Sequence, residues 1–183
     1  MSTPAPGGGR AGRPKGGGRA AAVERARAEA LASGEMLVVG WREYVALPDW
    51  GIERILAKSD TGAASSALDV GHLEELPGDR VAFDVVTSRR REDAIVHVVA
   101  DIVRRTRVRS SLGHPHDRIL VATTMVLGGI TKTIELGLVD RARMRCRMLL
   151  GRRTLQPEFL VDSGHAYLLG RRPRTPRIPP SAS

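Results

Sequence analysis

Short runs of aliphatic and β-branched residues, separated by turn-forming residues, follow one another through most of the chain. Runs of this kind are typical of β-strands, and few segments have the spacing of an amphipathic helix. Many short strands with few helices favour an all-β barrel or sandwich over about residues 36–170. The segments predicted to contain strands are 36–48, 53–60, 80–87, 94–103, 118–127, 130–139, 158–162 and 166–170.

Glycine-containing segments mark turns between these strands. Gly128 and Gly129 stand alone between two predicted strands, which is typical of a two-residue hairpin because glycine accepts positive φ angles. Residues 76–80, Leu-Pro-Gly-Asp-Arg, predict a second turn. After Gly151, residues 152–158 predict one short helix. The sequence therefore predicts a domain of strands with a single short helix.

The two ends of the chain depart from this pattern. Residues 1–22 and 171–183 are rich in Gly, Pro, Ser and Arg and contain no acidic residue. Such segments bury too little apolar surface to fold, so we predict that both are disordered. The Ala-, Glu- and Arg-rich residues 21–33 predict a short helix that ends at Gly34.

Three parts follow along the chain. They are a basic tail at residues 1–35 with a possible short helix, a folded domain at 36–170 and a basic Pro-rich tail at 171–183. Residues 1–22 and 171–183 carry eight of the nine net positive charges, and the remainder of the chain is close to neutral. Weak, salt-sensitive contact with RNA could come from the tails, but no aromatic interleaving or binding motif accompanies the charge. We therefore predict no specific nucleic-acid function.

The composition sets further limits. Aromatic residues make up only 3% of the chain, so the core must consist of Val, Leu, Ile and Ala. Cys146 is the single cysteine, which excludes an intrachain disulfide and a CxxC metal site, and no Cys–His signature surrounds it. No run approaches the roughly 18 apolar residues of a membrane span, and the N-terminus lacks the apolar region of a secretory signal. We expect a soluble, cytoplasmic protein with no membrane partner.

Residues 57–68, AKSDTGAASSAL, hold the first candidate chemistry. Asp60, Thr61 and Gly62 favour a tight turn, because Asp and Thr side chains bind nearby backbone and Gly accepts positive φ angles. The same triplet is typical of aspartic peptidases, in which the carboxylate points into a cleft and faces a second Asp. The triplet alone leaves the structural and the catalytic interpretation open.

A second pattern lies about 90 residues further along the chain. Leu149 and Leu150 are followed by Gly151 and Arg152. Two apolar residues before a glycine are common in core strands, but their order after Asp-Thr-Gly-Ala in a β-rich chain resembles a retropepsin. In that fold this strand lies beside the catalytic loop and supports it.

Longer segments make the resemblance more specific. Over about residues 38–165 the chain resembles a bacterial and archaeal family of retropepsin-like aspartic peptidases, long described as ATP-dependent zinc proteases. The resemblance departs at Cys146-Arg147, where the family usually has Tyr-Pro, and at Ser59, where an apolar residue is more usual. The matching segments, in order, are 40–48, 57–68, 108–121, 135–144 and 148–162.

The resemblance implies a closed retropepsin-like β-barrel with one short helix. It implies that Asp60 is the catalytic aspartate and that Thr61, Gly62 and Ala63 form its turn. It implies an aspartic endopeptidase, a hydrolase that cuts peptide or isopeptide bonds with an activated water and without metal. The residues that it places in structural support of the active site are Leu149, Leu150, Gly151 and Arg152.

One chain supplies one Asp-Thr-Gly, so the implied enzyme is a homodimer with Asp60 from each chain in a dyad. Asp162-Ser163-Gly164 also matches the triplet pattern and leaves a dyad within one chain as an alternative. A catalytically silent peptide-binding module with the same fold is the other alternative. Because the family is associated with ATP-grasp ligases, we predict a functional link to such a ligase, and an isopeptide or polyglutamate substrate becomes a hypothesis.

The residues give little support to a zinc or ATP site. Neither HExxH nor a phosphate-binding GxxxxGK[ST] loop occurs. His114 and His116 could place two imidazoles on one side of an extended segment, but two ligands do not make a zinc site. The remaining histidines are His72, His97 and His165. We predict neither a metal nor a cofactor.

A few residues remain as candidates. Arg118 could bind a substrate carboxylate or form a structural ion pair, and Ser111 is a second candidate for substrate binding or for a simple turn. Glu43, in the segment Trp-Arg-Glu-Tyr, is either functional or a carboxylate on the surface of a strand. Other arginines that could line a cleft or stay solvated are Arg141, Arg143 and Arg152.

Overall fold

The computed structural model describes residues 33–34, 36–87, 94–109, 115–139 and 146–170. The predicted tails and nearly all of the predicted helix at 21–33 lie outside these residues. The elements are β1 (Leu37–Gly40), β2 (Arg42–Leu47), the 3-10 turn η1 (Pro48–Trp50), β3 (Ile52–Asp60), β4 (Ser66–Asp69), β5 (Gly71–Leu76), β6 (Arg80–Val86), β7 (Ile95–Arg109), β8 (Pro115–Leu127), β9 (Ile130–Val139), β10 (Met148–Gly151), α2 (Arg152–Leu155) and β11 (Phe159–Asp162).

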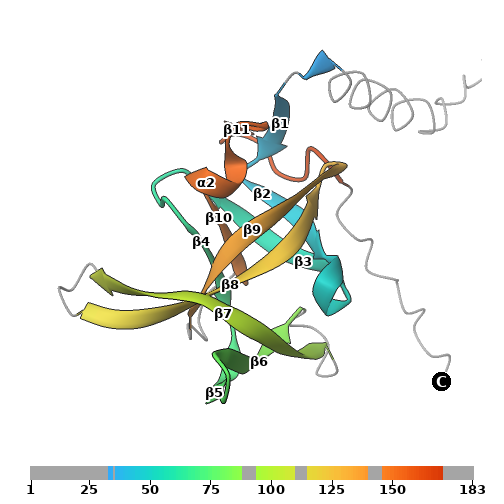
Figure 1. Ribbon diagram of the computed structural model, residues 1–183. Helices are drawn as coiled ribbons and strands as arrows, with labels where there is room; N and C mark the ends of the chain where they lie inside the picture. The colour runs from blue at the N-terminus through green and yellow to red at the C-terminus, as the bar shows by residue number, and fades with distance from the viewer. Residues whose placement is uncertain (1–32, 35, 88–93, 110–114, 140–145, 171–183) are drawn as a thin grey trace, which may run out of the picture.

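Six of the strands close into a barrel. The larger sheet has the order β2-β3-β10-β4-β9-β8-β7-β6-β5, and an additional pairing of β2 with β8 joins its two sides. β7, β6 and β5 continue beyond the barrel at its lower end, while β1 and β11 form a separate two-stranded sheet near α2 (Figure 1). The predicted all-β closed barrel with one short helix is confirmed. No helix in the described part of the chain is long and apolar enough to cross a membrane.

Alternating burial explains why these segments form strands. In β2 the side chains of Glu43, Val45 and Leu47 are buried while their neighbours are partly exposed. Burial of such aliphatic side chains contributes roughly 25 cal/mol for each Å² removed from water. As the composition required, the core is aliphatic, with Phe83 and Phe159 as its buried aromatic members in the described residues. Its fully buried members include Val39, Leu47, Ile55, Leu68, Val81, Val85, Val121, Met125, Leu136, Met148 and Leu150.

Most of the predicted strands and turns are confirmed. Gly128 and Gly129 join β8 to β9 with φ angles of 63° and 83°, as a two-residue hairpin requires. The turn at 76–80 is also present, with Gly78 and Asp79 at positive φ. Two strands, β4 and β5, were not predicted, because the first is only four residues long and the second is mostly polar.

The strand predicted at 166–170 was wrong. This segment has no strand partner, and a buried carboxylate takes the place of a strand ladder. Glu43 accepts hydrogen bonds from the backbone N–H groups of Gly40 (2.8 Å), Leu168 (2.7 Å) and Leu169 (3.4 Å). Glu43 is thus not a surface carboxylate. Its hydrogen bonds join β2 to the C-terminal end of the domain, and this role is called here the Glu43 clamp.

Glu43→Ala is expected to lower the free energy of unfolding by about 2–4 kcal/mol, because three backbone N–H groups lose the acceptor that the buried Glu43 side chain supplies. Glu43→Gln keeps one carbonyl acceptor, so its free energy of unfolding is expected to lie between those of Glu43→Ala and the wild type. Urea denaturation measures both. Glu53→Ala, an exposed position on β3, is the matched control, with an expected change within about 0.5 kcal/mol. Equal midpoints for Glu43→Ala and Glu53→Ala would contradict the role of Glu43 as a clamp.

Candidate active site

Asp60 is the last residue of β3, and the chain turns immediately after it. The Ala63 N–H donates to the Asp60 carbonyl oxygen at 3.2 Å, which closes the turn over residues 60–63. Ala57 and Ser59, earlier in the strand, are buried, whereas Asp60 is half-buried and Thr61 is exposed. The barrel therefore holds the strand rigidly and presents the Asp60 carboxylate at its edge.

The strand β10 supports this turn from behind. It lies between β3 and β4, parallel to the first and antiparallel to the second, with Gly151 in register with Asp60. A Cβ at Gly151 would lie 2.5 Å from the carbonyl carbon and oxygen of Ser65, so the backbone after the turn packs directly against the glycine. Leu150 belongs to the barrel core, while Leu149 is half-buried on the opposite side. Residues 149–151, which the resemblance places in support of the active site, thus lie directly beside the Asp60 turn.

The helix α2 holds the turn from one side. The backbone N–H of Arg152 donates to Ala63 O (2.9 Å), and that of Arg153 donates to Ala64 O (3.1 Å). The Arg152 guanidinium donates to two further carbonyl oxygens, of Thr61 (2.8 Å) and Gly62 (3.0 Å). Arg152 therefore binds the backbone of the turn.

A pair of buried hydroxyls completes the support, and sequence reasoning missed it. Ser66 Oγ accepts a hydrogen bond from the Gly151 N–H at 2.9 Å and lies 2.6 Å from Thr154 Oγ1. Both side chains are almost fully buried. They connect β4, β10 and α2 behind the Asp60 turn. In the sequence, the only signal for this pair is the polar type of two residues: Ser66, shortly after Asp-Thr-Gly, and Thr154, shortly after Leu-Leu-Gly.

One face of the sheet continues from Asp60 across several strands. Leu149 pairs with Ala67 in β4, and Ala67 pairs with Gly137 in β9. Residues two apart on a strand point to the same side, so Asp60, Leu149, Ala67 and Gly137 share one side of the sheet, named here the Asp60 face. Arg118 also lies there, because a Cβ at Gly137 would be 2.6 Å from its Cδ. The structure thus brings Arg118 to the same face as Asp60, whereas Ser111 lies outside the described residues.

The second Asp-Ser-Gly triplet makes a different arrangement. Asp162 accepts hydrogen bonds from the Gly164 N–H (2.7 Å) and contacts His165 Nδ1 (2.7 Å) through its other oxygen. The Gly164 N–H, followed by the His165 side chain, lowers the pKa of Asp162 below its usual value. Among the described residues it forms no hydrogen bond with Asp60, so the geometry gives no support to a dyad within one chain.

The described residues also contain no metal-binding cluster. No three His, Cys, Asp or Glu side chains in this part of the chain come together as ligands. His97 and His165 each contact a single carboxylate, Asp84 and Asp162 respectively. His114, Arg141 and Arg143 lie outside the described residues, and the Cys146 side chain is buried.

A family comparison agrees with this architecture. Residues 38–172 match the RimB-like family, described as retropepsin-like aspartic endopeptidase RimB. The chain belongs to this family. A solved structure of a Legionella pneumophila protein of unknown function has the same fold, with a TM-score of 0.60 and 23% identity over 72% of this chain and 97% of that one. The retropepsin-like fold and the family that the motifs predicted are therefore confirmed.

Curated relatives carry another name. The chain is 29% identical over 141 residues to a protein of Shewanella pealeana and 30% identical over 137 residues to one of Parasynechococcus marenigrum, each named "Probable alpha-L-glutamate ligase". The matches cover 75% and 73% of this chain but only 31% and 29% of those proteins. The chain thus spans less than a third of the length of these relatives.

Proposed function

We propose that the chain is an aspartic endopeptidase whose catalytic dyad consists of Asp60 from each subunit of a homodimer. The observation that carries this proposal is the half-buried Asp60 at the start of a turn held by Gly151 and Arg152. A dyad needs two such carboxylates, and each chain supplies one supported Asp-Thr-Gly turn among its described residues. A two-fold axis beside the Asp60 turn would place the second carboxylate opposite the first.

The proposed reaction is a general acid–base hydrolysis. Two carboxylates at close range share one proton, because both cannot be ionised comfortably. The ionised Asp60 takes a proton from a water molecule as its oxygen attacks the peptide carbonyl carbon, and the protonated Asp60 donates its proton to the carbonyl oxygen. The tetrahedral intermediate then breaks its C–N bond as a proton passes to the leaving nitrogen. These steps need neither a metal nor a covalent intermediate.

The direct test is cleavage of an unbiased peptide library by the purified full chain, from acid to neutral pH, with and without EDTA. The molecular mass of each sample is measured in parallel. Cleavage by a dimer that survives EDTA and is lost in Asp60→Ala is the expected result. Cleavage that EDTA abolishes and Asp60→Ala retains would overturn the proposal and restore the zinc hypothesis.

A peptide-binding module is the second candidate function. The same sheet edges that present a substrate could hold an extended peptide by strand addition without cutting it. A folded dimer that binds library peptides, with an affinity that Asp60→Ala leaves unchanged and without cleavage, would favour this function over the peptidase.

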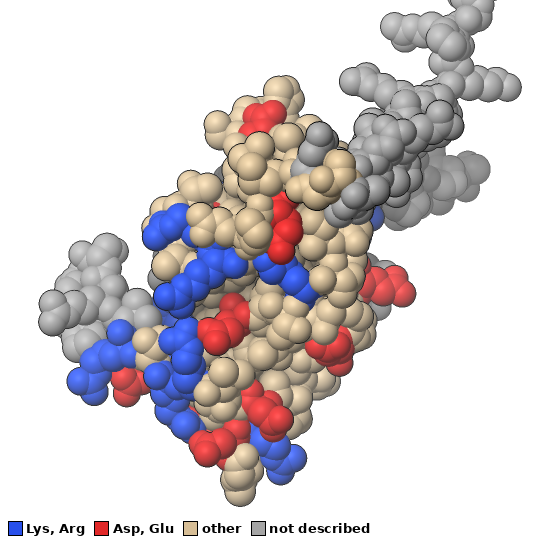
Figure 2. Space-filling model, turned by 45° about the horizontal axis from the view of Figure 1, so that its top comes forward, with Lys and Arg blue, Asp and Glu red and all other residues tan. Residues whose placement is uncertain are grey.

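The substrate is proposed to be a glutamate-rich chain, joined by peptide or isopeptide bonds, and the functional partner an ATP-grasp ligase in the cytoplasm. Two observations support this. Similar proteins are named as glutamate ligases, and the basic residue Arg118 lies on the Asp60 face. Figure 2 shows Lys and Arg side chains gathered on one side of the molecule, with acidic residues among them. Glutamate oligomer conjugates should be bound and cut in preference to glutamine oligomers. Failure to bind or cut them would reject this substrate class.

Arg152→Met is expected to lower kcat/KM by about tenfold to a hundredfold, because the Asp60 turn loses two hydrogen bonds that fix its carbonyl groups. Arg152 is exposed, so the folded state should lose little stability. Both hydrogen bonds come from the single nitrogen Nη1. Arg152→Lys keeps the charge and one nitrogen with several N–H donors on a shorter side chain, and should recover activity in part. Full activity of Arg152→Met would contradict a positioning role.

A further inference from the structure

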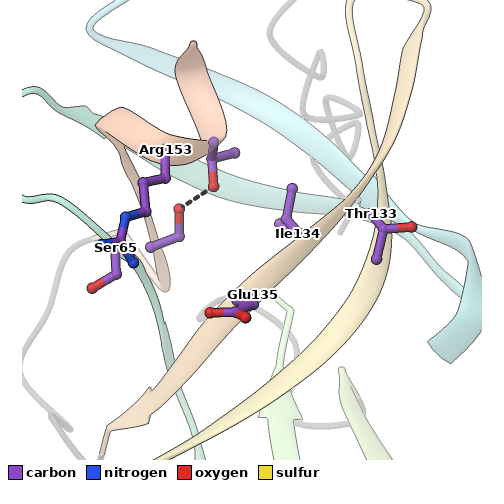
Figure 3. Close-up of a pocket in the computed structure, with 7 residues that line it drawn as sticks. Ser65, Thr133, Ile134, Glu135 and Arg153 are labelled. Carbon is purple, nitrogen blue, oxygen red and sulfur yellow. Dashed lines mark hydrogen bonds between the residues drawn. The ribbon is translucent and has the colours of Figure 1, made fainter. Parts of the chain in front are cut away.

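A cavity of about 210 Å³ lies beside the Asp60 turn, between the start of β4, the strand β9 and the helix α2. Figure 3 shows Arg153 and Ser65 on one side of it and Glu135 on the other. Six of its seven lining residues are of polar or charged types, which distinguishes it from the barrel core. The lining residues are Ser65, Ser66, Thr133, Ile134, Glu135, Arg153 and Thr154.

The cavity opens on the same side of the sheet as the Asp60 face, and it lies two residues from Gly137 along β9. Glu135 lies two residues before Gly137 in β9, so its side chain points to the same side. Ser65 directly precedes β4 and packs on Gly151. β9 lies three strands from β3 in the sheet order, about 14 Å at the usual spacing of neighbouring strands. An extended peptide that crosses the strands from Asp60 can place a side chain about four residues away into this cavity.

Two charged side chains line the cavity, and only one of them, Glu135, has a partner of opposite charge among the described residues. The Arg153 guanidinium makes no hydrogen bond or ion pair with any residue in the described part of the chain, although its backbone N–H binds Ala64. The Glu135 carboxylate is already bound by Arg104, whose Nη2 and Nε lie 2.6 and 3.2 Å from Oε2. The hydroxyls of Ser66 and Thr154 are bound to each other. The cavity thus presents one cation without a partner among the described residues, with the Ser65 hydroxyl on the same side of the cavity (Figure 3).

We propose that this cavity is a substrate subsite that binds a carboxylate, with the Arg153 guanidinium as its cation and specificity-determining group. The subsite rests on the proposed peptidase function and adds to it a position of acidic preference away from the scissile bond. A guanidinium binds carboxylates through two parallel N–H donors, and the Ser65 hydroxyl on the same side supplies a further donor. The carboxylate comes either from an acidic side chain or from the C-terminus of the substrate.

The test uses peptides that the wild-type chain cuts, in which a single Glu is moved through each position on both sides of the scissile bond and compared with Gln. The wild type should prefer Glu by about tenfold in kcat/KM at one position. Arg153→Met should remove the preference at that position alone, and Arg153→Glu should turn it toward Lys. Arg80→Met, the same change at an exposed position of β6 at the other end of the sheet, is the matched control and should keep the preference. Peptides with amidated and with free C-termini separate the two sources of the carboxylate.

Two results would overturn the subsite: no position of Glu preference in the wild type, or a preference that Arg153→Met retains. If no peptide is cut, the proposed activity fails, and the subsite is then decided by binding. Fluorescence anisotropy of the same labelled peptides with Asp60→Asn and with the double variant Asp60→Asn, Arg153→Met gives this measurement. The subsite would be sustained if Asp60→Asn binds the Glu peptides more tightly than the Gln peptides and the double variant does not. Equal binding of the Glu peptides to both proteins would reject it.

Discussion

Asp60→Asn is expected to abolish peptide cleavage, lowering kcat/KM by at least about a thousandfold while the barrel stays folded. Asparagine has nearly the shape of aspartate, so the turn and its support by Gly151 should remain. It can neither take a proton from water nor share one with a second carboxylate. Asp162→Asn is the matched control: this carboxylate is held within its own turn by Gly164 and His165, and its loss should leave cleavage unchanged.

Dimers that combine a wild-type chain with an Asp60→Asn chain test whether the dyad is shared between the two chains. When equal amounts of wild-type and Asp60→Asn chains are unfolded and refolded together, about a quarter of the dimers contain two wild-type chains. Activity should fall to about a quarter of that of the same total amount of wild-type chains. A fall to one half would show that each chain works alone. A loss in Asp162→Asn as large as that in Asp60→Asn would instead restore the dyad within one chain.

The parts of the fold that sequence predicts are those decided by near neighbours in the chain. The hairpin at Gly128-Gly129 needs two positive φ angles, and only the local residue type decides whether they are accessible. The segment 166–170 has the same apolar composition as a strand, but the distant Glu43 carboxylate satisfies two of its N–H groups. No local pattern contains that information, so the predicted strand was wrong there.

The same division applies to the candidate site. The Asp60 turn is visible in three consecutive residues, and Gly151 in a short motif. The groups that join them come from positions about 90 residues apart, such as the Arg152 guanidinium on the carbonyls of Thr61 and Gly62. The Ser66–Thr154 hydroxyl pair is equally non-local. Such contacts depend on the closure of the barrel, which brings β10 between β3 and β4, and only the structure supplies it.

Gly151→Ala is expected to cost about 3 kcal/mol of folding free energy or more, and to abolish cleavage by any folded remainder. The added Cβ would lie 2.5 Å from the carbonyl carbon and oxygen of Ser65 and 2.9 Å from its nitrogen. These are backbone atoms directly before β4, a strand that pairs with both β10 and β9, so they cannot rotate away as a side chain could. Relief requires β10 to move away from the start of β4, and the support of Asp60 moves with it.

Urea denaturation and the peptide-cleavage rate measure the two effects of Gly151→Ala. Gly71→Ala is the matched control, another strand glycine whose nearest neighbour to an added Cβ is the Asp84 Cβ at 3.8 Å, an ordinary contact distance. It should change stability by less than about 1 kcal/mol. Because the clash involves the Ser65 backbone, the second-site change Ser65→Gly should not rescue Gly151→Ala. Rescue by Ser65→Gly, or wild-type stability and activity in Gly151→Ala itself, would contradict the close backbone packing that we assign to the support of Asp60.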